Sequence, residues 1–147
     1  MASFLRGVFD TNVLLAAKLT PSAASPAAEI LDRWQRREFT FLYSLDILTE
    51  YADKLRQKGI SAEVITTFLR RLLGIGEAVS IVAFHFRHYP VDPDDVRFLL
   101  CALNGRATHL VTYDPHLLSL RPFYTAELAI CSPIEFLVDC RRSTSPK

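Results

Sequence analysis

Four acidic residues of this chain could together hold a divalent cation: Asp10, Glu50, Asp95 and Asp114. Asp10 directly follows a short apolar segment typical of a strand, and Asp114 follows another. The carboxyl ends of strands are where open α/β sheets place their ligand crevice. Carboxylates that converge there would repel one another strongly unless a cation neutralised them. The pattern predicts a metal site, and oxygen ligands with few competing histidines favour Mg²⁺ or Mn²⁺ over Zn²⁺.

Each of these residues also has a purely structural interpretation. Asp92 and Asp114 each precede a proline, which is a helix N-cap pattern, and Asp95 would then lie in the first turn, where the helix dipole stabilises it. Asp10 could likewise cap a helix, and Glu50 could pair with the lysine four residues later. The joint arrangement favours a site, because all these points face one edge of a parallel sheet.

The elements that must position these residues alternate between strands and helices. Period-2 and aromatic segments predict strands at 5–9, 39–43, 80–84, 108–112 and 128–130. Capping signals and helical periodicity predict helices at 11–15, 26–37, 45–58, 61–73, 92–104, 115–118 and from 133 onward. This order predicts a three-layer α/β/α fold with a mainly parallel sheet.

The 147 residues, half of them apolar, are enough for a single domain, expected at 1–140 with a disordered tail at 141–147. No apolar run is long enough to span a bilayer, and the first residues lack the apolar stretch of a secretory signal, so we expect a cytoplasmic protein without membrane contact. The three cysteines show no CxxC spacing, which argues against a zinc ribbon or a disulfide framework.

The formal charge of +1 lacks the basic signature of a dedicated nucleic-acid binder. Arginines do cluster at 33–37, 70–71 and 141–142, although each cluster taken alone is typical of a solvated helix face. An aspartate after a first strand also occurs in haloacid-dehalogenase-type phosphatases, which place a second aspartate two residues later. Asn12 stands there in this chain and cannot serve as that acid.

Five segments in order resemble the PIN-domain ribonucleases: 9–14, 44–51, 92–102, 110–118 and 130–136. The resemblance covers nearly the whole chain apart from the tail. It implies a PIN-like fold and a ribonuclease that hydrolyses RNA phosphodiesters with Mg²⁺ or Mn²⁺.

The acidic quartet of that family carries over onto Asp10, Glu50, Asp95 and Asp114, both as catalytic residues and as metal ligands. Asn12, Asp92 and Thr112 are expected to support the site. Two positions depart from the family pattern. Tyr113 replaces a frequent glycine and could stack on a base, and His116 replaces a frequent acidic residue, so a second metal would be held less tightly.

The resemblance further implies the toxin half of a toxin–antitoxin pair, with a cognate antitoxin and a homodimeric assembly. Its substrate would be single-stranded or looped RNA. An RNA-processing role remains open beside the toxin role. The alternative from another functional class is a non-catalytic RNA- or protein-binding module on the same fold, against which the intact quartet argues.

Overall fold

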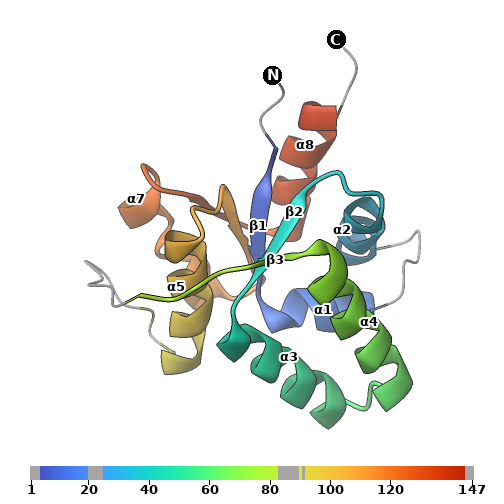
Figure 1. Ribbon diagram of the computed structural model, residues 1–147. Helices are drawn as coiled ribbons and strands as arrows, with labels where there is room; N and C mark the ends of the chain where they lie inside the picture. Colours follow the sequence, from blue (N-terminus) through green and yellow to red (C-terminus); the bar gives the residue numbers. More distant parts are fainter. Residues whose placement is uncertain (1–3, 20–24, 83–89, 91, 145–147) are drawn as a thin grey trace.

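A five-stranded parallel sheet in the order β3-β2-β1-β4-β5 forms the centre of the protein (Figure 1). The computed structural model describes residues 4–19, 25–82, 90 and 92–144. The strands are β1 (Arg6–Phe9), β2 (Thr40–Tyr43), β3 (Glu77–Ala78), β4 (His109–Val111) and β5 (Ala129–Cys131). The helices are α1 (Thr11–Ala17), α2 (Pro26–Gln35), α3 (Leu45–Gln57), α4 (Ala62–Ile75), the 3₁₀ helix η1 (Pro93–Asp95), α5 (Val96–Asn104), α6 (Pro115–Leu118), α7 (Arg121–Tyr124) and α8 (Pro133–Thr144).

Helices cover both faces of the sheet, which confirms the predicted three-layer α/β/α fold. Helix α5 packs against β1, β2 and β4 on one face, while α8 packs against β4 and α2 on the other (Figure 1). Ser25, Ser44 and Ser61 accept hydrogen bonds from backbone N–H groups in the first turns of α2, α3 and α4, as their capping patterns predicted.

The order of the strands creates a switch point beside β1. The chain runs outward from β1 to β2 and β3, and then returns to place β4 and β5 on the other side of β1. Phe9 is in register with Val111 of β4, and the backbone N–H of Asp10 donates to the Val111 carbonyl at 3.0 Å. Ligands of open α/β sheets bind at the carboxyl ends of strands at such a point.

An aromatic cluster fixes the end of β1 in place. The ring of Phe9 packs against Phe39, Phe41 and Phe136 with centroid distances of 4.7–5.5 Å. Tyr51 of α3 is fully buried, and its hydroxyl donates a hydrogen bond to the Phe9 carbonyl. The residue next to Asp10 is therefore anchored by packing and by a hydrogen bond from α3.

We expect Tyr51→Phe to lower the free energy of unfolding by ~1 kcal/mol, because it removes this buried hydrogen bond while keeping the ring. Urea denaturation at one protein concentration measures the change. Tyr113→Phe removes a hydroxyl from a half-exposed ring and is the matched control. Equal stabilities for Tyr51→Phe and the native protein would mean that the bond contributes nothing.

The third strand lies earlier than predicted. The expected strand at 80–84 is wrong for Ser80–Val82, which form no strand, and 83–84 lie outside the described residues. Pairing with β2 occurs at Glu77 and Ala78 instead. Gly76 explains the shift, because a Cβ there would lie 3.0 Å from the Phe41 carbonyl oxygen and 2.6 Å from that of Leu72. The chain therefore reaches β2 right after the glycine.

The other corrections concern the ends of elements. Helix α8 continues through Thr144, so residues 141–144 are helical where a tail was expected, and 145–147 lie outside the described residues. The short helix α7 was not predicted. Asp92 caps a 3₁₀ turn, η1, which leads directly into α5.

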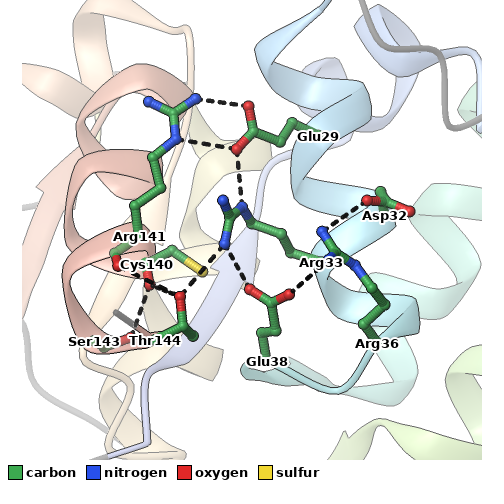
Figure 2. Close-up of polar contacts among 9 residues, drawn as sticks. All are labelled: Glu29, Asp32, Arg33, Arg36, Glu38, Cys140, Arg141, Ser143 and Thr144. Atoms are coloured by element: carbon green, nitrogen blue, oxygen red, sulfur yellow. Dashed lines mark hydrogen bonds and ion pairs between the residues drawn. The ribbon is translucent and has the colours of Figure 1, made fainter. Parts of the chain in front are cut away.

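Two of the arginine clusters are ion-pair networks within the protein. Figure 2 shows Arg33 of α2 between Glu29 and Glu38, at 2.8 and 2.6 Å. Arg141 of α8 binds both carboxylate oxygens of Glu29, at 2.6 and 3.1 Å. Arg36 pairs with Asp32 and Glu38. Arg33 and Arg141 join α2 to α8, whereas Arg36 pairs with residues of α2 and of the turn that follows it.

Within the described part of the chain, no helix combines the length and the apolar composition needed to cross a membrane.

Candidate active site

A cavity of about 250 Å³ opens at the carboxyl ends of the strands. All four predicted carboxylates line it, and they come from the end of β1, from α3, from η1 and from the end of β4. The full lining is Asp10, Thr11, Asn12, Leu15, Glu50, Lys54, Lys58, Asp92, Asp94, Asp95, Phe98 and Asp114. The structure thus brings together residues that are up to 104 positions apart in the chain.

Thr112 connects the two carboxylates that follow strands. Its hydroxyl donates to Asp10 Oδ2 at 2.8 Å and accepts from the backbone N–H of Asp114 at 2.9 Å. Asp10 is only 5% exposed and stands at the N-cap position of α1. Burial raises the pKa of Asp10, the Thr112 hydrogen bond opposes the rise, and the charge of Asp114 adds to it. The backbone N–H groups of Asn12 and Thr11 also oppose the rise in the pKa of this carboxylate.

Asp95 is a buried carboxyl group of the cavity whose pKa is strongly raised. It is 6% exposed, and its Oδ2 atom is buried without a hydrogen-bond partner. Burial, followed by the neighbouring Asp114 and Asp10, raises its pKa to about 8. A hydrogen bond with the Asp114 side chain contributes to this rise in pKa, so the neutral form of Asp95 is favoured beside two other carboxyl groups. Thr11 Oγ1, a second oxygen of the lining, is also buried without a partner.

Asp114 and Asp92 both have structural roles as well. Asp114 Oδ1 accepts the backbone N–H of His116 at 2.9 Å and so caps α6. Asp92 Oδ1 accepts the N–H of Asp94 at 2.9 Å. The capping interpretation therefore holds for these two residues, and the side chain of Asp114 also hydrogen-bonds with that of Asp95.

Glu50 has a partner that the sequence did not indicate. Arg97 Nη1 of α5 lies 2.6 Å from Glu50 Oε2, and no ion pair joins Glu50 to Lys54 within the described residues, so the alternative interpretation of Glu50 as a partner of Lys54 does not hold. Arg97 also lies 3.8 Å from Asp46 and 3.6 Å from Asp94. The only signal for Arg97 was its place three residues after an acidic position on the same helix.

The remaining predicted residues lie at the edge of the cavity. Asn12 is exposed and lines it. Tyr113 is 43% exposed and is not part of the lining, so its ring lies on the rim rather than in the core. His116 is exposed, and its backbone N–H donates a hydrogen bond to Asp114 Oδ1. Among the described residues, no group of three or more His, Cys, Asp or Glu side chains is already arranged to hold a metal ion.

Residues 6–116 match the sequence model of the PIN domain. The chain belongs to the PIN-domain family. A comparison with curated proteins finds no match. The matched part of this PIN domain includes β1 to β4 and every carboxylate of the cavity, while β5 and α8 lie beyond it.

Membership of the PIN-domain family indicates which ligands the cavity is suited to bind. PIN domains have a nuclease-type fold, generally use divalent metals and act on nucleic acid. The lining of this PIN domain fits such an ion, because its acidic donors are all oxygens and two buried oxygens, on Asp95 and Thr11, have no partner.

Proposed function

We propose that this PIN domain is an endoribonuclease that hydrolyses RNA phosphodiesters with Mg²⁺ or Mn²⁺. The observation that carries the proposal is the buried Asp95 carboxyl group, which lies beside Asp10 and Asp114 without a counter-charge. A cation removes the repulsion that raises the pKa of Asp95. Asp10, Asp95 and Asp114 would hold it, and Glu50 would contribute once Arg97 releases it.

The residues around the cavity have different roles in the proposed hydrolysis. A divalent ion supplies, when bound, activation of a water nucleophile and neutralisation of the phosphate charge. Thr112 orients the Asp10 carboxylate toward the cavity and ties it to the backbone of Asp114. The anchored carbonyl of Phe9 keeps the end of β1 from moving. A carboxylate set held in place before the substrate arrives needs little rearrangement during the reaction.

Two lysines support a nucleic-acid substrate. Glu50, Lys54 and Lys58 follow one another at i, i+4 spacing along α3, and all three line the cavity. Two positively charged side chains therefore lie beside the acidic groups of the cavity. Phosphate contacts by lysine are independent of base sequence and supply most of the affinity for a nucleic-acid backbone.

The exposed ring of Tyr113 supports a preference for single-stranded or looped RNA, because unpaired bases stack on aromatic rings. We expect Tyr113→Ala to weaken the binding of single-stranded RNA by ~1–3 kcal/mol, and to leave metal affinity and the melting temperature nearly unchanged. Fluorescence anisotropy and thermal melting on the same samples measure both quantities.

Phe4→Ala is the matched control, since it removes an exposed ring before β1, at the opposite edge of the sheet. Unchanged RNA affinity together with a loss of several degrees in the melting temperature would make Tyr113 a structural residue.

Cleavage of a labelled single-stranded RNA by the purified protein tests the proposed activity. Cleavage with Mg²⁺ or Mn²⁺ that stops with EDTA supports it. The alternative, a non-catalytic RNA- or protein-binding module, predicts binding without cleavage under every metal condition. The Oδ2 atom of Asp95, which is buried without a hydrogen-bond partner, and the crowding of Asp95 by Asp114 and Asp10 favour the nuclease, because a binding module has no need of a buried repulsive cluster.

The family resemblance supports a finer proposal: the cytoplasmic toxin of a toxin–antitoxin pair, homodimeric and bound by a cognate antitoxin. An RNA-processing role is the alternative within the same activity. A small neighbouring reading frame that encodes a DNA-binding segment followed by a disordered segment would support the toxin role.

A further inference from the structure

Arg97 places a single positive charge among three carboxylates, two of which line the cavity. Its Nη1 atom lies 2.6 Å from Glu50 Oε2 and 3.8 Å from Asp46 Oδ1, and its Nη2 atom lies 3.6 Å from Asp94 Oδ1. Of these partners, Glu50 and Asp94 line the cavity. The guanidinium therefore belongs to the same electrostatic unit as the proposed metal ligands.

The three contacts differ greatly in strength. The side chains of Asp46 and Asp94 are 66% and 65% exposed, and long contacts between exposed charges contribute little. The Glu50 side chain is 11% exposed and that of Arg97 is 23% exposed, so this short pair is largely removed from water. Glu50 is thus the one strong partner of Arg97, and half of its carboxylate is occupied by the guanidinium.

The same contact affects any cation that enters the cavity. Glu50 Oε2 cannot bind a cation and the guanidinium at full strength at the same time, and the positive charge of Arg97 repels a second positive charge nearby. If Glu50 turns to a cation, Arg97 keeps only its two exposed, longer contacts. A guanidinium whose fork-shaped donors are free is well suited to a phosphate, which it can bind through two parallel hydrogen bonds.

We propose that Arg97 is a competing counter-ion for Glu50, which lowers the affinity of the cavity for a divalent cation and moves to a backbone phosphate of the RNA when cation and RNA are both bound. This inference rests on the proposed nuclease function. Under this proposal each ligand strengthens the binding of the other. A cation that binds Glu50 frees Arg97 for the RNA phosphate, and an RNA phosphate that binds Arg97 frees Glu50 for the cation, so the coupling is reciprocal. Arg97 affects the affinity for the cation only through its contact with Glu50, so it is a positioning residue for the metal site.

The proposal predicts opposite changes in two affinities for Arg97→Gln. Removal of the competing charge should tighten Mn²⁺ binding in the absence of RNA by about tenfold. Loss of the phosphate partner should weaken RNA binding in the presence of Mn²⁺ by about tenfold. Arg97→Lys keeps the charge but not the fork, so its Mn²⁺ affinity should stay near that of the native protein while its RNA affinity falls part of the way.

Isothermal titration with Mn²⁺ alone and anisotropy with a single-stranded RNA plus Mn²⁺ provide the two readouts. Arg56→Gln is the matched control, because Arg56 also carries one positive charge, lies on α3 and is 75% exposed, with a long contact to Asp53. Its Mn²⁺ affinity should stay within about twofold of the native value. A tightening as large as that of Arg97→Gln would show a general charge effect and overturn the proposal.

A merely structural Arg97 would give another pattern. If the pair only clamps α3 to α5, Arg97→Gln would lower the melting temperature and weaken both affinities, and that result overturns the proposal. Asp10→Asn, titrated in parallel, separates the two levels of inference. If Asp10→Asn binds Mn²⁺ more weakly but Arg97→Gln does not bind it more tightly, the metal site stands and only the proposed role of Arg97 is rejected. If Asp10→Asn binds Mn²⁺ as the native protein does, both the proposed metal site and the role of Arg97 are rejected.

Discussion

Asp10→Asn should abolish metal-dependent RNA cleavage and leave the folded protein intact. Asp10 joins both halves of the cavity, because its carboxylate accepts the Thr112 hydroxyl and its backbone N–H pairs with Val111 of β4. Loss of a ligand at the centre of a metal site costs several kcal/mol in the transition state, so we expect the rate to fall by about 10³-fold or more. The asparagine keeps the hydrogen bond from Thr112 and removes one of the crowded charges, so stability should hold or rise.

A cleavage assay at matched protein and Mg²⁺ concentrations, with thermal melting beside it, measures both effects. Asp53→Asn is the control for the same chemical change on an exposed part of α3 outside the cavity. Cleavage by Asp10→Asn at the native rate would place the activity elsewhere. A collapse of its melting temperature would assign Asp10 a structural role.

Asp95→Asn should be more stable than the native protein in EDTA, and increasingly so as the pH rises from about 4 to about 8. Burial and the charges of Asp114 and Asp10 raise the pKa of Asp95 from 3.8 to about 8 in the folded protein. Folding therefore favours the protonated form. The stability linked to that proton is present below the unfolded pKa and is lost as the pH rises through the folded value. Asparagine does not ionise, so the variant avoids the loss.

The difference should be small near pH 4 and level off above pH 8. Each ~1 kcal/mol of it corresponds to about 2–4 °C in a domain of this size. Saturating Mn²⁺ should reverse the order, because only the native carboxylate gains a cation. A native protein that is the more stable of the two in EDTA at pH 8 would show that Asp95 has a compensating partner and no need of a metal.

The order of elements and the position of the acidic quartet follow from local signals that the sequence displays. Ser25, Ser44 and Ser61 cap helices where their patterns placed them, and Ser132 with Glu135 forms the predicted capping box at the start of α8. Strand β1 ends directly before Asp10, and β4 ends at Val111, three residues before Asp114. Parallel pairing of these strands then brings both carboxylates to one edge.

The features that the sequence did not indicate depend on how elements pack across long separations. Glu50 pairs with Arg97, 47 residues away, because α5 places that side chain beside α3, whereas the local rule favoured Lys54. Strand β3 lies at Glu77–Ala78 because Gly76 approaches β2 closely, while the apolar Ile81 and Val82 that suggested a strand are exposed. Neither arrangement has a local pattern.

The arginine clusters show the same distinction between composition and structure. The sequence indicates solvated helix faces for Arg33, Arg36 and Arg141, and their guanidinium groups bind carboxylates of α2 and its C-terminal turn. Lys54 and Lys58 line the cavity, and Arg97 pairs with Glu50, which is part of the lining. Nucleic-acid contacts of this PIN domain are thus expected around the cavity and not along α2.

Thermal melting with and without Mn²⁺ tests most directly whether the acidic cavity holds a divalent cation. The comparison is between the native protein and a fourfold variant, Asp10→Asn, Glu50→Gln, Asp95→Asn and Asp114→Asn. An ion that binds only the folded state at about 100 times its Kd adds ~2.7 kcal/mol, or about 5–10 °C here. We predict such a rise for the native protein and none for the variant. An equal rise in both proteins would place the ion outside the cavity and contradict the account.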